Sequence, residues 1–301
     1  MNDKKKYIDD GAPVTAHIYG DTVELSNSLG GMPIMQKISK DQMVNRQTGE
    51  VKDIHHVTSR ADPKNYESLR ATFKKLKRII GANFKGGQSE LWITLTYKDS
   101  PMKDSERLYK DFKIFMKRLR KETGKYLAYI VVIEPQRSGS LHAHLLLKTL
   151  DKSRLYIENS VVAQLWGQGF VNVRRLKDSD NVGAYLMAYL TNIDINNLED
   201  KPDNRKKISK KIIKGGRLGL YPINMQIYRR SRYGIVNPIK IKGLRKEIKH
   251  KYNLDNIDPN YYRSFEVQRS NDDKPFEIET EYYSIKEAKL KKALDKINRN
   301  N

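Results

Sequence analysis

Two histidines flank a single alanine in the otherwise apolar segment Leu141–Lys148 (LHAHLLLK). Side chains alternate along a strand, so in a strand His142 and His144 point to the same face, two residues apart. Neutral imidazole is a common metal ligand, and two imidazoles buried without a partner are costly. The pair alone fits a solvated sheet face equally well, so its chemistry depends on what lies beside it.

An acidic residue ends the preceding apolar segment, Tyr126–Glu134 (YLAYIVVIE). The short turn that follows predicts a hairpin with the histidine strand. If Glu134 lies opposite His142, all three side chains share one face, with Cβ atoms about 5 Å apart across the strands. Two imidazoles and a carboxylate without sulfur can hold Mg²⁺ or Mn²⁺ and leave positions open for phosphate oxygens and water. We therefore expect Glu134, His142 and His144 to bind a divalent metal.

A second feature with chemical potential is a pair of tyrosines in the helix predicted over 180–192. Tyr185 and Tyr189 are four residues apart and so lie one turn from each other on the same face. A pair of core tyrosines is the simplest explanation of this spacing. Their use as nucleophiles requires a metal that polarises a phosphate nearby.

The elements that must position these residues follow a regular order. A helix is predicted over 63–84, followed by a strand over 91–97, a helix over 105–122, strands over 126–134 and 141–148, a helix over about 153–166, a strand over 170–176 and the tyrosine helix. From the second element on, the order β-α-β-β-α-β-α predicts an α+β fold of the ferredoxin-like (RRM-like) type, an antiparallel sheet with helices on one face. In the first of these strands Thr94 and Thr96 face away from the alternating leucines and isoleucine, where they are expected to line a path for DNA.

Composition limits the class of partner. The chain has 301 residues and a formal net charge of +22, which favours an anionic polymer such as nucleic acid. It has no cysteine, which excludes a disulfide framework and thiolate metal sites. No apolar run approaches the length of a membrane span, and the lysine-rich start has no secretory pattern. We expect a cytoplasmic protein that binds DNA and not a membrane.

The positive charge is concentrated in residues 205–251, which hold sixteen Lys or Arg and one Glu, a local charge of +15. A solvated surface explains most charge runs. Here aromatic rings that could stack on bases are interleaved with guanidinium groups that could contact phosphates. The side chains concerned are Tyr221, Tyr228, Tyr233, Arg229, Arg230 and Arg232. The sequence thus suggests four segments: a polar N-terminal extension (1–58), a catalytic domain (59–195), a basic DNA-binding segment (196–251) and a C-terminal tail (252–301).

Three segments in this order, LWITLTY, GSLHAHLLL and AYLMAYLTN, resemble the ordered motifs of the HUH endonucleases, which include rolling-circle replication initiators of plasmids and phages. The resemblance covers about residues 89–193. The segments WGQGFVNVRRL and RLGLYPINMQIYRRSRYG are similar to initiators from plasmids, phages and integrative elements of Gram-positive bacteria. One position departs from the family pattern: the lysine three residues after the motif-three tyrosine is replaced by Ala188 or Asn192.

The resemblance implies that Glu134, His142 and His144 bind the metal, that Tyr189 attacks a DNA phosphate and that Tyr185 is a second nucleophile. It implies an origin-nicking enzyme that acts on single-stranded or extruded DNA, with host helicase and polymerase as partners. A conjugative relaxase or a single-strand transposase would share this chemistry. If the protein only bound nucleic acid without catalysis, there would be no reason for Glu134, His142 and His144 to share one face.

Overall fold

The computed structural model describes residues 7–28, 35–56, 58, 63–98, 101–136, 138–176, 193–194, 212–213, 219–267 and 276–299. The chain divides into two compact units, unit 1 with residues 1–56 and 237–301, and unit 2 with residues 57–236. Residues 1–56 and the C-terminal residues, which the sequence suggested as separate segments, therefore form one unit. In the described part of the chain the fold is mixed α+β with antiparallel sheets and five helices.

Unit 2 contains a five-stranded sheet in the order β12-β7-β8-β6-β9, in which every neighbouring pair is antiparallel. Its strands are β6 (Glu90–Leu95), β7 (Leu127–Pro135), β8 (Leu141–Thr149), β9 (Val171–Arg175) and β12 (Tyr228–Arg230). The predicted order β-α-β-β-α-β is confirmed from β6 to β9. A crossover through α2 (Ser105–Thr123) leads from β6 to β7, and one through α3 (Asn159–Trp166) leads from β8 to β9. Each crossover joins strands that are separated by another strand, and β12 is added at the free edge of β7.

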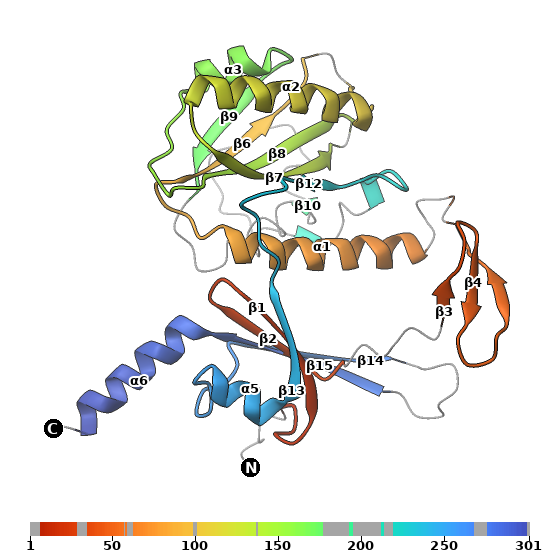
Figure 1. The fold of residues 1–301 in the computed structure, drawn as a ribbon, viewed down its shortest axis with the longest axis vertical. Coiled ribbons are helices and arrows are strands. Elements are labelled where there is room, and N and C mark those ends of the chain that lie inside the picture. The colour runs from red at the N-terminus through yellow and green to blue at the C-terminus, as the bar shows by residue number, and fades with distance from the viewer. Residues whose placement is uncertain are drawn as a thin grey trace, which may run out of the picture. The chain divides into compact units, whose positions relative to one another are not determined.

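Helices cover both faces of this sheet, and the prediction of helices on one face is wrong. The side of the sheet that carries Leu91, Ile93 and Leu95 packs against α2 and α3 in one core cluster. The opposite side, with Trp92 and Val132, packs against α1 (Pro63–Asn83) in a second cluster (Figure 1). The reason is that β7 is apolar at nearly every position, so both of its faces need cover.

Three predicted helix boundaries differ from the structure, and one of them is the end of α2, which lies at Thr123 and not at residue 122. Helix α1 ends at Asn83, one residue before the predicted end. There the Asn83 side chain donates through Nδ2 to the carbonyls of Ile79 and Val236 at 2.7 and 2.8 Å. Helix α3 begins at Asn159 and not near residue 153. Leu155 and Ile157 before it are buried alternately, a strand-like pattern, and the Leu155 amide donates to the Gln88 carbonyl at 2.9 Å.

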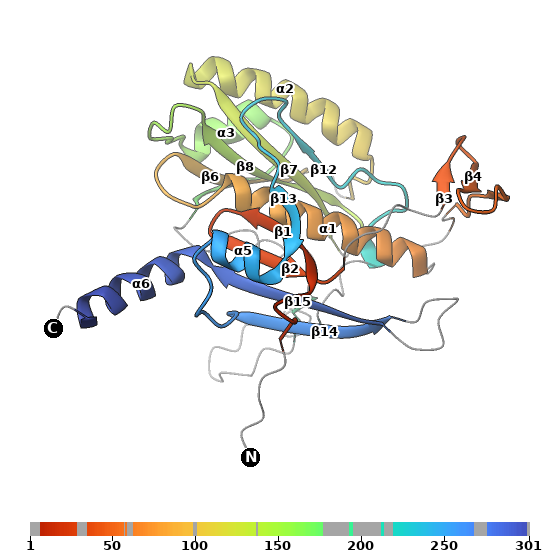
Figure 2. The same ribbon diagram turned by 60° about the horizontal axis from the view of Figure 1, so that its bottom comes forward.

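Unit 1 is built on a second five-stranded antiparallel sheet in the order β13-β1-β2-β15-β14 (Figure 2). Its strands are β1 (Pro13–Tyr19), β2 (Thr22–Ser26), β13 (Ile239–Leu244), β14 (Tyr261–Val267) and β15 (Phe276–Ser284). Both ends of the chain contribute, because β1 pairs with β13 and β2 pairs with β15. Helix α5 (Arg245–Lys251) follows β13, and α6 (Ile285–Arg299) follows β15. A separate three-stranded sheet holds β3 (Met35–Lys37), β4 (Gln42–Asn45) and β5 (Val51–Asp53).

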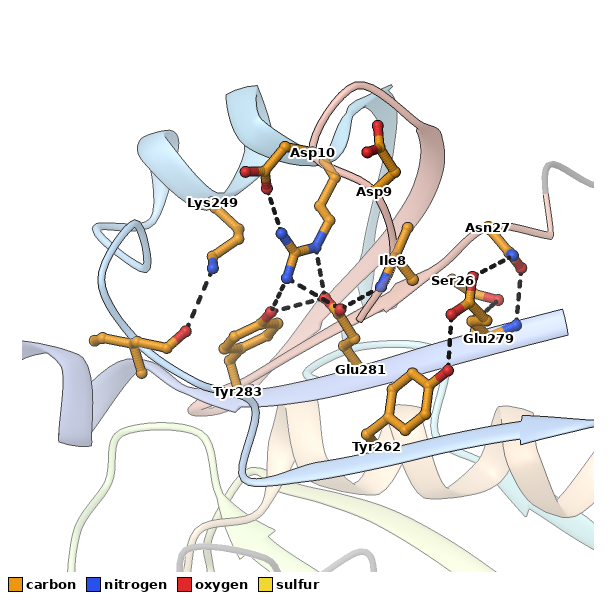
Figure 3. A network of polar contacts seen from close by, with 12 residues as sticks. Ile8, Asp9, Asp10, Ser26, Asn27, Lys249, Tyr262, Glu279, Glu281 and Tyr283 are labelled. Carbon is orange, nitrogen blue, oxygen red and sulfur yellow. Dashed lines mark hydrogen bonds and ion pairs between the residues drawn. The ribbon is translucent and has the colours of Figure 1, made fainter. Parts of the chain in front are cut away.

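A buried ionic network joins the two chain ends inside unit 1 (Figure 3). The Glu281 carboxylate is fully buried and accepts from Arg245 Nε at 2.9 Å, Arg245 Nη2 at 3.0 Å and Tyr283 Oη at 2.7 Å. It also accepts from the Ile8 amide at 3.0 Å, and Arg245 Nη1 contacts Asp10. Burial lowers the pKa of Arg245, but the hydrogen bonds and charge of Glu281 outweigh it, so the pKa is raised on balance. This network fixes α5 and the N-terminal residues against β15.

Two short strands, β10 (Ile193–Asp194) and β11 (Ile212–Ile213), pair with each other in unit 2. Within the described ranges, no helix is both long enough and apolar enough to cross a membrane.

Candidate functional site

The site is built on the hairpin of β7 and β8. Its turn is closed by a hydrogen bond from the Gln136 backbone N–H to the Ser140 carbonyl at 2.8 Å. Gly139 in this turn has a positive φ of 82°, which a residue with a side chain rarely adopts. The register places Glu134 directly opposite His142, as the sequence predicts, and Val132 opposite His144. The three predicted metal ligands therefore share one face of two neighbouring strands.

Glu134 and His144 are in direct contact through Oε2 and Nε2. Glu134 is completely buried and His144 is 2% exposed, whereas His142 is partly exposed. A carboxylate removed from water is costly without a positive or hydrogen-bonding partner, and His144 supplies that partner here. Glu134 and His144 therefore form a buried polar pair inside an otherwise apolar sheet, and their contact offsets part of the cost of burial.

Thr94 holds the other side of the His144 ring. It lies opposite His144 in the β6–β8 register, and its hydroxyl is 3.3 Å from Nδ1. A carboxylate accepts, so in the neutral ring Nε2 carries the proton toward Glu134 and Nδ1 accepts from the Thr94 hydroxyl. Trp92 packs edge-on against the same ring, with 5.9 Å between ring centroids. These contacts fix the orientation of His144.

His144 lies in a row of residues that runs across the whole sheet, next to the row of Glu134 and His142. The register aligns, strand by strand, Asn172, Thr94, His144, Val132 and Tyr228. Asn172 was not among the predicted site residues. The alternation in VNVRR, with two valines that pack against the α2–α3 cluster, would have placed it on the same face as His144.

The family resemblance implies a divalent metal, and the donor types fit one. A buried carboxylate touches an imidazole nitrogen, and a second imidazole faces it across the hairpin. Within the described residues, no group of three or more His, Asp or Glu side chains is arranged as a metal site. The donor types and the shared face of Glu134, His142 and His144 fit a divalent metal.

The remaining predicted residues are placed as follows. Tyr185 and Tyr189 lie outside the described residues. Thr96 donates through its hydroxyl to the Phe170 carbonyl at 2.8 Å, so it ties the end of β6 to the start of β9. Gly169 beside this contact approaches the chain so closely that a Cβ would lie 2.5 Å from the Lys98 nitrogen.

The predicted basic segment is not one body, because residues 237–251 belong to unit 1 and the residues before them to unit 2. Within unit 2, Arg229 and Arg230 of β12 lie on opposite faces of the sheet. Arg229 lies over the Tyr109 ring of α2 at 3.6 Å and donates through Nε to Gln226 at 2.9 Å. Arg230, on the other face, and Arg232 are exposed. The prediction that Tyr221 stacks on bases is wrong, because Tyr221 is completely buried and packs edge-on against Phe73 of α1. Tyr221 belongs to the core cluster that the apolar side chains of α1 form on this face of the sheet.

Residues 90–194 match the family model of the replication-associated proteins of the ORF2 and gene II protein type, which describes a replication initiator family. The match begins with β6 and includes Thr94, Glu134, His142 and His144, together with both candidate tyrosines. It covers about a third of the chain. No curated protein and no solved structure gave a significant match. This part of unit 2 is therefore similar to proteins of DNA replication.

Proposed function

We propose that this protein is a rolling-circle replication initiator that nicks one DNA strand at an origin and later rejoins it. The observation that carries the proposal is the buried contact between Glu134 and His144, with His142 opposite, inside the region that matches a replication family. A sheet that only binds nucleic acid has no need of a buried carboxylate–imidazole pair. The initiator family match also favours this function over a conjugative relaxase or a single-strand transposase.

The antiparallel order β7-β8-β6-β9 with its two crossovers supports a ferredoxin-like domain of the HUH type. In this proposal Glu134, His142 and His144 would hold Mg²⁺ or Mn²⁺, in exchange for the direct contact of Glu134 with His144. When bound, the metal polarises the scissile phosphate. Thr94 keeps the His144 ring in place by its bond to Nδ1, the kind of support that ligand histidines commonly receive.

Tyr189 is the proposed nucleophile. The phenol loses its proton as its oxygen forms a bond to the phosphorus, the bond from phosphorus to the 3′ oxygen breaks, and the departing oxygen takes up a proton. The products are a 5′-phosphotyrosine and a free 3′-OH. The phosphodiester energy is kept in the covalent link, so a later attack by a 3′-OH rejoins the strand. Tyr185 would serve a second transfer. This assignment rests on the motif resemblance and on the one-turn spacing of the two tyrosines.

The proposed partners follow from this chemistry. The substrate is origin DNA, single-stranded or extruded as a hairpin, and the net charge of +22 favours its approach. A host polymerase would extend the 3′-OH, and a host helicase would unwind the duplex. We propose that the protein acts in the bacterial cytoplasm, where these partners are found.

The test is formation of a covalent protein–DNA adduct with labelled single-stranded origin DNA and Mn²⁺, separated on a denaturing gel. We expect an adduct with the wild type, and none with His142→Ala, with His144→Ala or in the presence of EDTA. Each histidine variant should still bind DNA, because the basic surfaces are unchanged. An adduct that forms at the wild-type rate with His144→Ala would contradict the proposed site.

A further inference from the structure

A polar cleft lies within unit 2 between α1 and the segment that leads into β12. Its volume is about 670 Å³, within the usual range of small-ligand sites, so it can take a nucleotide. Helix α1 contributes Ser68, Thr72 and Lys75 to its wall. The opposite wall contains Tyr228 and Arg230.

The chemistry of the cleft suits a polyanion with aromatic parts. Lys75 and Arg230 are exposed cations on opposite walls, and none of the described residues that line the cleft is acidic. The hydroxyls of Ser68 and Thr72 offer uncharged hydrogen bonds to phosphate or sugar oxygens. Tyr228 is half-buried, and burial raises its pKa, so its phenol stays neutral and its ring offers a flat surface.

The cleft lies on the same sheet face as the candidate site. Tyr228 lies in the same cross-strand row as His144, with Val132 between them, and therefore on the same sheet face. Two strand spacings put their backbones about 10 Å apart. Arg230 follows two residues further along the same face, opposite Ile130. This spacing is short enough for one DNA strand to reach both the site and the cleft.

We propose that this cleft binds the single DNA strand next to the scissile phosphate, with a base stacked on Tyr228 and phosphates held by Lys75 and Arg230. The occupant is a single strand because stacking on Tyr228 requires an unpaired base, and the bases of a duplex are already stacked on each other. The inference rests on the proposed function for the identity of the substrate. It goes beyond that function by assigning the path of the DNA and by adding α1, which lies outside the family match, to the binding surface.

The experiment measures binding of a short fluorescent single-stranded oligonucleotide to the full chain, in EDTA so that no cleavage occurs. The charge variant combines Lys75→Ala with Arg230→Ala. Its matched control combines Lys113→Ala with Lys117→Ala, which removes the same charge from the exposed side of α2. We expect the charge variant to bind about tenfold more weakly at about 0.15 M salt and to lose about 1.4 from the salt slope, about 0.7 per phosphate contact. The control should be close to wild type in both.

The stacking arm compares Tyr228→Phe with Tyr228→Leu. Phenylalanine keeps the flat ring, so its affinity should match the wild type, whereas leucine should weaken binding about fivefold or more. A duplex of the same sequence should lose little affinity with leucine. The proposal is overturned if the charge variant behaves like its control, if leucine equals phenylalanine, or if the duplex is affected as strongly as the single strand. Adduct formation is measured separately, so a protein that makes no adduct but shows these losses would overturn the nicking function and keep the cleft. If the wild type forms the adduct but the cleft variants bind DNA as the wild type does, the nicking function is kept and the cleft proposal is overturned.

Discussion

Replacement of Glu281 by alanine should unfold unit 1 selectively. The side chain is fully buried and accepts four hydrogen bonds, two of them from Arg245. Its removal leaves the buried guanidinium with the contact to Asp10, whose side chain is 70% exposed, and with a hydrogen bond to the Tyr283 hydroxyl at 3.1 Å. It also leaves the Ile8 amide without this acceptor. The network joins residues from both chain ends, so its loss affects the pairing of β1, β13 and β15 together.

The expected magnitude follows from the charge that is left behind. Removal of one partner of a buried ion pair costs about 3–5 kcal/mol of unfolding free energy. Glu281→Gln keeps the shape and one acceptor oxygen, so it should cost less than alanine. The double variant Glu281→Leu with Arg245→Met removes both charges and should be less destabilised than Glu281→Ala, because a buried pair replaced by apolar residues is often near neutral.

Hydrogen exchange on the full chain is the assay, because two units need not unfold in one step. Peptides from β1, β2 and β15 should lose protection in Glu281→Ala, while peptides from β7 and β8 serve as the internal reference. The control is Glu277→Ala, an exposed residue on the same strand, expected within about 0.5 kcal/mol of wild type. Equal protection of unit 1 in Glu281→Ala and Glu277→Ala would refute the reasoning.

Three further predictions concern unit 2 and the buried phenols. Thr94→Val should weaken divalent-metal affinity about tenfold or more by freeing the His144 ring, and Thr94→Ser should restore it. Calorimetric titration measures both, and equal affinities of the valine and serine variants would refute the positioning role. Gly169→Ala should lower the free energy of thermal unfolding by about 1–3 kcal/mol, because its Cβ would meet backbone atoms at 2.5 and 2.6 Å. Gly243→Ala, whose Cβ would have its nearest contact at 3.5 Å, should cost less, and equal costs would count against the close approach. Burial raises the pKa of three phenols, so they stabilise the fold below the unfolded pKa of about 10, and this stabilisation is lost as pH rises above it. Alkaline denaturation with tyrosinate absorbance can follow this loss; ionisation of all 18 tyrosines before unfolding would contradict the prediction. These phenols are Tyr97, Tyr109 and Tyr283.

The hairpin that carries the site was predictable because its signals are local. The alternation in β8 sets which side chains share a face, and the short turn limits the register, so Glu134 opposite His142 followed from sequence. The role of Thr94 was not predicted, because its contact with His144 depends on the pairing of β6 with β8, about fifty residues apart.

Features that depend on distant pairing were missed. The nearly continuous apolar pattern of β7 indicates that both faces of the sheet are packed against other elements. It does not indicate which element packs on the second face, although the helix α1 was itself predicted. Unit 1 depends on strands from both chain ends, and no local pattern reveals that β1 pairs with β13. Tyr221 shows the same limit, since a tyrosine in a basic segment looks like a stacking surface until the apolar side of α1 is placed against it.

The most direct test of the central claim is to identify the residue and the DNA end in the covalent adduct. Single-stranded origin DNA labelled at either its 5′ or its 3′ end is incubated with the protein and Mn²⁺, and the adduct is digested and mapped by mass spectrometry. The account predicts that only the 3′-labelled fragment stays on the protein, through a 5′-phosphate on Tyr189, that Tyr189→Phe prevents the adduct, and that Tyr185→Phe slows rejoining more than the first cleavage. Cleavage without any adduct, or an adduct on a residue other than these two tyrosines, would contradict it.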